Sequence, residues 1–210
     1  GRDLAEVARR LGLADLQIAG FMSGGAFALC AAQALGDEVR RVLIASARPP
    51  GSKRESERDA RHRLVLFRRR LLQSAWLADT VFAVLRLQMT PAHIARIVRT
   101  GASAPGDAAY LAAHPGVVDF ITEYIRESLA VSARGIAAEV RCAAQDPPFR
   151  IPHLSAPVTL WQGGDDPLAS AEDAAAWLAE LSPEVRLIEG VGHFLPHKHW
   201  PEVLGWLAEG

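Results

Sequence analysis

The sequence predicts an α/β fold, in which helices alternate with the strands of a parallel sheet. Short and almost continuously apolar segments, each followed by a helix-like stretch, are typical of strands covered on both faces. Four such segments lie near residues 16–20, 39–46, 157–162 and 185–189. Residues 51–150 have helical spacing broken by Gly and Pro instead, so we expect a helical cap inserted between the second and third strands. The expected core domain is therefore residues 1–50 and 151–210.

The first half of the expected core consists of a helix, a strand, a glycine turn and a second helix. Apolar residues recur at helical spacing over residues 1–13, and the apolar segment 15–20 suits a buried strand. The run Gly20-Phe21-Met22-Ser23-Gly24-Gly25 leads directly into an alanine-rich helix over residues 26–32. The next apolar segment, residues 39–46, is too continuous for a sheet with one face in water.

The second half repeats this alternation. A helix over residues 171–181 separates the third and fourth strands, and residues 202–209 close the chain as a helix. Crossovers between parallel strands are right-handed and stack the strands into one covered sheet. We therefore expect the four strands to be adjacent and parallel, with the cap over their carboxyl ends.

Charge and composition narrow the class of function. The chain has 210 residues, half of them hydrophobic, and 23 basic against 24 acidic side chains give a net charge of −1. Such a chain has no bulk field to attract phosphate backbones or acidic lipid, so we expect no nucleic-acid or membrane partner. The most basic stretch, residues 61–70, follows acidic side chains at residues 55–59, which indicates a solvated helix face.

Cys30 and Cys142 lack a Cys-x-x-Cys spacing, so we interpret them as buried small hydrophobes of a soluble, cytoplasmic protein.

The sequence predicts neither a metal site nor a cofactor. His193, His197 and His199 lie close together, but Pro196 and Pro201 interrupt the helix that a His-x-x-x-His site needs. No phosphate-binding or dinucleotide-binding glycine motif follows a strand.

The glycine turn after the first strand has the pattern of a nucleophile elbow. In such a turn a strand passes sharply into a helix, the central residue has a positive φ, and small residues stand two places before and after it. Gly20 and Gly24 hold these two places, so the central residue is Met22. A shift by one residue would make Ser23 central and put Phe21 where a ring does not fit, so we reject Ser23 as an elbow nucleophile.

This turn and two later loops resemble the α/β-hydrolase superfamily. The run Gly163-Gly164-Asp165-Asp166-Pro167 follows the third strand and is similar to the acid turn of that superfamily, which selects Asp166. The run Gly190-Val191-Gly192-His193-Phe194 follows the fourth strand and is similar to its histidine loop. The order elbow, acid, histidine is also that of the superfamily. The resemblance implies a site in which the ring of His193 lies between Met22 and Asp166, with the backbone N–H of Ser23 facing a developing oxyanion.

Two departures from the superfamily pattern affect the expected chemistry. Met22 has no hydroxyl proton for an imidazole to take, and its thioether cannot carry an acyl group reversibly. In the superfamily about four strands precede the elbow strand, and a loop after one of them supplies the second oxyanion donor. Here the elbow strand begins near residue 16, and by itself it would be a long apolar edge. We therefore expect a preceding segment, a partner chain or a homodimer contact to complete the sheet.

Three functions follow from this pattern. The first is a hydrolase-like protein with a substituted nucleophile that binds a ligand or regulates another protein. The second is an enzyme of non-classical chemistry, in which His193 and Asp166 act on a small-molecule substrate beneath the cap. The third is an active serine-type hydrolase of a small ester or amide, with Ser23 as its nucleophile. The residues of the cap contain no motif that indicates a substrate.

Overall fold

A computed structural model describes the chain except for residues 48, 50–73, 103, 144–150, 152 and 210. The basic stretch 61–70 and the acidic side chains before it lie outside the described residues, and so do the surroundings of the Cys142 side chain. The chain divides into two compact units. The first, called the sheet unit, comprises Gly1–Pro49, Ala102–Tyr110 and Arg150–Gly210, and the second, called the helical unit, comprises Pro50–Gly101 and Leu111–Phe149.

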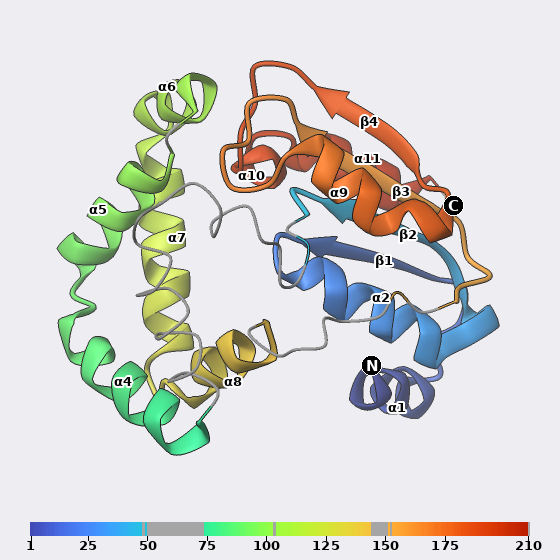
Figure 1. The fold of residues 1–210 in the computed structure, drawn as a ribbon, viewed down its shortest axis with the longest axis horizontal. Coiled ribbons are helices and arrows are strands. Elements are labelled where there is room, and N and C mark those ends of the chain that lie inside the picture. The colour runs from blue at the N-terminus through green and yellow to red at the C-terminus, as the bar shows by residue number, and fades with distance from the viewer. Residues whose placement is uncertain (48, 50–73, 103, 144–150, 152, 210) are drawn as a thin grey trace. The chain divides into compact units, whose positions relative to one another are not determined.

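The sheet unit contains the four strands that the sequence predicts, in the order β1-β2-β3-β4 (Figure 1). They are β1 (Leu16–Phe21), β2 (Val39–Ala45), β3 (Val158–Gly163) and β4 (Glu184–Ile188). All three pairings are parallel, which confirms the predicted sheet. Because the strands are parallel, their carboxyl ends and the loops that follow them lie along one edge.

Helices cover both faces of this sheet. The helices of the unit are α1 (Arg2–Leu11), α2 (Gly24–Leu35), α9 (Ala171–Leu178), α10 (Leu195–Lys198) and α11 (Trp200–Ala208), with short 3-10 turns at Gly36–Glu38 and Ala179–Leu181. Helices α2 and α9 lie on one face and α11 lies on the other (Figure 1). The two faces of β2 are therefore both buried, and four consecutive residues, Val42 to Ala45, are fully inaccessible to solvent. Cys30 on α2 is a free and only half-buried thiol, not the fully buried residue we expected, and its partial burial raises its pKa.

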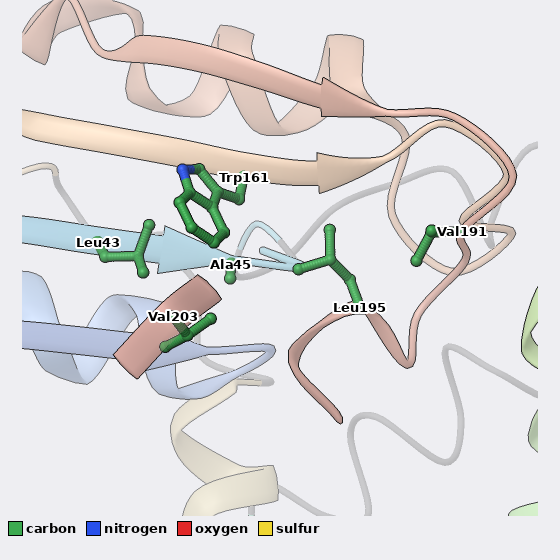
Figure 2. Close-up of a cluster of buried hydrophobic side chains, with 6 residues drawn as sticks. All are labelled: Leu43, Ala45, Trp161, Val191, Leu195 and Val203. Atoms are coloured by element: carbon green, nitrogen blue, oxygen red, sulfur yellow. The ribbon is translucent and has the colours of Figure 1, made fainter. Parts of the chain in front are cut away.

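One core cluster links the sheet to the loop that carries His193. It consists of Leu43, Ala45, Trp161, Val191, Leu195 and Val203 (Figure 2). Val191 and Leu195 stand two residues before and two residues after His193, and both are almost fully buried. Burial of an aliphatic side chain of this size contributes about 1.5–3 kcal/mol. Both ends of the histidine loop are thus held in the core.

The helical unit contains no described strand, in keeping with the helical spacing of its sequence. Its helices are α4 (Ala75–Gln88), α5 (Pro91–Gly101), α7 (Pro115–Ser128) and α8 (Arg134–Ala143), and α5 packs on α7 while α4 packs on α8. Helix α6 (Pro105–Ala113) crosses the boundary between the units, since Ala102–Tyr110 groups with the sheet unit. Residues 102–110 lie within the insert expected at residues 51–150 but group with the sheet unit, because side chains of this segment form hydrogen bonds with the histidine loop and the residues after it. Among the described helices, none is long and apolar enough to cross a membrane.

Candidate active site

Met22 has the backbone conformation of an elbow centre. Its φ is 53°, and its N–H donates to the carbonyl oxygen of Ala45 on β2 at 3.0 Å. Ser23, in contrast, has a φ of −63° and forms the N-cap of α2. A left-handed conformation costs an ordinary side chain about 1–2 kcal/mol, so the fold imposes it at residue 22 against the local preference.

Close packing at the elbow explains one of the two flanking glycines. A Cβ on Gly20 would lie 2.6 Å from the Cβ of Ala28 and 2.8 Å from the carbonyl oxygen of Gly24, which are impossible separations. A Cβ on Gly24 would meet nothing within 4 Å, so the requirement that we expected for a small residue there does not hold. The crowded position is Gly25, where a Cβ would lie 3.1 Å from Ile44.

The carboxylate of Asp166 is fully buried and bonded at both oxygens. Its Oδ1 accepts from the N–H groups of Leu168 and Ala169 at 2.8 and 3.1 Å, and its Oδ2 accepts from Nε2 of Gln162 at 3.2 Å. The same Oδ2 lies 2.9 Å from Nδ1 of His193. An ionised carboxylate can only accept, so Nδ1 carries the proton and Nε2 of the neutral ring holds a lone pair. This is the tautomer that a general base requires.

Gln162 is a site residue that the sequence analysis missed. Its side chain is fully buried, its Nε2 also donates to the carbonyl oxygen of Ala169 at 2.8 Å, and its Oε1 accepts from the N–H of Ala47 at 2.9 Å. One amide therefore ties the end of β2 to the acid loop and orients Asp166. An amide side chain within an otherwise apolar buried strand is the signal that could have revealed it.

Backbone bonds join the acid loop to the histidine loop. The N–H of Gly164 donates to the carbonyl oxygen of Ile188 at 2.9 Å, and the N–H of Asp165 donates to that of Val191 at 3.0 Å. The approach is so close that a Cβ on Gly163 would lie 2.4 Å from the Val191 oxygen. The contact between Asp166 and His193 thus rests on two loops that are fixed against each other.

A second buried carboxylate, Asp107 of α6, also holds the histidine loop. Its Oδ1 accepts from the N–H of Gly192 at 2.9 Å, and its Oδ2 accepts from the N–H of Phe194 at 3.1 Å. The sequence analysis missed Asp107 because it stands in the segment interpreted as cap, far from the loop in sequence.

The other two histidines near His193 have different surroundings. Burial, and after it the charge of His193, lowers the pKa of His197, whose carbonyl oxygen accepts from the hydroxyl of Tyr110 at 3.0 Å. Nδ1 of His199 lies 3.0 Å from Oε1 of Glu202. The backbone N–H of Glu202, and after it His199, lowers the pKa of that carboxyl. Within the described part of the chain, no group of three His, Cys, Asp or Glu side chains could hold a metal ion.

The structure thus brings two of the expected site residues into contact and places the third on the same edge of the sheet. Asp166 and His193 touch, and Met22 follows the carboxyl end of β1. The approach of Met22 to the imidazole, and an oxyanion donor at Ser23, stay predictions.

Comparisons with known proteins give likeness in fold alone. No protein-family model matches the sequence, and a search of curated proteins finds no match. Among solved structures, a thermophilic esterase from Thermogutta terrifontis superposes with a TM-score of 0.67 at 22% identity, over 99% of this chain and 68% of the esterase. An α/β-hydrolase enzyme from a Medee basin deep-sea metagenome library has a TM-score of 0.62 at 13% identity, over 97% and 67% of the two chains. An esterase from Exiguobacterium antarcticum has a TM-score of 0.60 at 16% identity, over 98% and 71%.

Proposed function

The chain has the α/β-hydrolase fold, and on that premise we propose that it is a hydrolase-like protein that handles a small molecule without a covalent acyl intermediate. The observation that carries this proposal is the positive φ of Met22 beside the ordinary helical φ of Ser23. It supports Met22, not Ser23, as the residue at the elbow.

A methionine at the elbow removes the first step of serine-type hydrolysis. That step needs a hydroxyl or thiol whose proton passes to the imidazole while its oxygen or sulfur attacks the carbonyl carbon. The thioether of Met22 has no such proton, and its sulfur is only a weak acceptor. No effect of His193 and Asp166 on the pKa of a neighbouring group can give Met22 the hydroxyl or thiol that this step requires.

The pair of Asp166 and His193 can still act as a general base. The buried Asp166 holds the Nδ1 proton of His193, so Nε2 is left to take a proton from water or from a bound ligand. General-base catalysis of this kind contributes about 10²–10⁴-fold, well below what a complete covalent triad achieves. The proposed function is therefore ligand binding, or slow non-covalent chemistry on a small molecule.

Restoring the hydroxyl tests this proposal. We expect a fluorophosphonate probe, read by intact mass, to leave the parent protein unlabelled. Activated-ester turnover in the parent should lie close to that of His193→Ala, with only the general-base contribution of His193 between them. Where a preceding segment or partner chain completes the sheet and its oxyanion loop, Met22→Ser should become labelled and should gain at least about 100-fold in ester turnover, and the gain should vanish with Asp166→Ala. Met22→Ala is the matched control, because it removes the thioether without adding a hydroxyl.

Two outcomes would overturn the proposal. One is labelling of the parent protein that disappears in Ser23→Ala, which would make Ser23 the nucleophile of an active hydrolase. The other is a folded Met22→Ser protein that shows no gain even though the sheet and its oxyanion loop are complete, which would show that residue 22 does not face the imidazole.

A further inference from the structure

The backbone on both sides of His193 is bound to one carboxylate. Gly192 and Phe194, the neighbours of His193 in the chain, each donate their N–H to a different oxygen of Asp107. Hydrogen bonds from backbone N–H to an ionised carboxylate are short and roughly twice as strong as neutral ones. Together the two bonds hold the peptide between Val191 and Gly192 and the peptide between His193 and Phe194. They therefore restrict the backbone on both sides of His193, and with it the direction in which its side chain leaves the backbone.

The contact between α6 and the histidine loop is direct, and at two glycines it leaves no space for a side chain. A Cβ on Gly192 would lie 2.4 Å from Oδ2 of Asp107 and 2.5 Å from the Cβ of Ala104. A Cβ on Gly106 would lie 1.9 Å from the carbonyl oxygen of Gly190. Asp107 is 1% exposed, so its charge is removed from water and depends on these two N–H groups. Glycines on both sides of the contact are what allow it to form.

The same helix binds the loop region a second time, one turn further on. Tyr110 stands three residues after Asp107, on the same side of α6, and its hydroxyl donates to the carbonyl oxygen of His197. Beyond Tyr110 the helix continues into the helical unit. The end of α6 that holds the histidine loop is therefore covalently continuous with that unit.

We propose that Asp107 is a positioning residue, which binds the histidine loop to α6 and so holds His193 in bonding distance of Asp166. The inference rests on the proposed function, in which His193 is the base. A purely structural role would be different: an acidic residue in the first turn of a helix stabilises the helix through its dipole and need not affect the imidazole at all.

The Nδ1 proton of His193 reports on this role without any need for activity. Its NMR signal, assigned by its loss in His193→Gln, should be present in the parent and shifted or lost in Asp107→Asn, which keeps one acceptor oxygen but turns an NH2 group toward a backbone N–H. Glu172→Gln is the matched control, because it removes an exposed acid from the first turn of α9 and should leave the signal unchanged. In a Met22→Ser background, Asp107→Asn should lower kcat by about 10- to 100-fold with KM nearly constant.

An unchanged Nδ1 signal in folded Asp107→Asn would overturn the proposal, whatever the loss of stability. If that variant does not fold, amide exchange in the parent decides instead: the N–H groups of Gly192 and Phe194 should be protected, and exchange as fast as in exposed loops would overturn it. Failure of Met22→Ser to gain activity when the sheet and its oxyanion loop are complete would refute the proposed function, while the signal of His193 would still decide the role of Asp107.

Discussion

His197 stands four residues after His193, and the folded state disfavours its charged form. Burial of the ring is the main cause, and the nearby His193 adds repulsion, so the pKa of His197 lies below its ordinary value of 6.5. Well above pH 6.5 the ring is neutral in both the folded and the unfolded chain, and it has no effect on stability. As the pH falls toward and through 6.5, the unfolded chain binds a proton that the folded chain does not yet bind, so the free energy of unfolding decreases.

We therefore expect the parent to lose stability as the pH falls from about 7.5 to about 5, and His197→Gln to lose less. One such group contributes at most about 1.4 kcal/mol per pH unit. Urea unfolding at a series of pH values measures the difference. His153→Gln, at an exposed histidine, should follow the parent curve. Glu202 has little effect on stability between pH 7.5 and pH 5, because its pKa is lowered from 4.5 and it titrates below this range. Parallel curves for the parent and His197→Gln would contradict the prediction.

At the scale of elements, the site is two loops that follow neighbouring parallel strands and lie directly against each other. Gly163, the last residue of β3, stands at the point of closest approach. A side chain there would have to displace the backbone of the histidine loop, since its Cβ would lie 2.4 and 2.5 Å from the carbonyl oxygens of Val191 and Gly192.

Gly163→Ala should lower the free energy of unfolding by about 1–3 kcal/mol, because well-packed atoms have to move. Gly205→Ala is the control with the opposite expected sign. Gly205 lies within α11, where a Cβ meets nothing within 4 Å, so alanine should stabilise the protein by about 0.5–1 kcal/mol. Urea denaturation of both variants gives the comparison. Equal stability of Gly163→Ala and the parent would contradict the close contact between Gly163 and the histidine loop.

Local sequence patterns predict some parts of this fold and site but not others. The strand expected at residues 39–46 forms as Val39–Ala45, because burial on both faces leaves a continuous apolar run that is easily recognised. The contact between Asp166 and His193 could be predicted because each stands within a short glycine motif directly after a strand. Asp107 bonds to a residue 85 positions away, and nothing in its helical neighbourhood indicates that contact. Local patterns reveal residues fixed by their own turn, whereas a buried long-range hydrogen bond requires the tertiary structure.

At the scale of the whole molecule, one side of the sheet unit combines an outer strand with exposed apolar side chains. β1 is an outer strand, and in the described part of the chain it pairs with β2 only. Helix α1, which packs on α2, has a buried side of alanines and an exposed side of larger residues. These exposed residues are Leu4, Val7 and Leu11, at 49%, 50% and 66% exposure. Exposed strand edges and contiguous apolar patches favour association with another chain.

We therefore expect the 210-residue chain to associate in a concentration-dependent manner through α1. A lysine in place of Val7 puts a charge in the middle of the exposed apolar side, and it should shift sedimentation velocity profiles toward the monomer. Leu204→Lys on α11 is the matched control, because Leu204 is 47% exposed and lies on the opposite face of the sheet from the helix on which α1 packs. It should leave association unchanged. A parent chain that sediments as a monomer at every concentration would show that neither the edge of β1 nor the apolar side of α1 needs a partner.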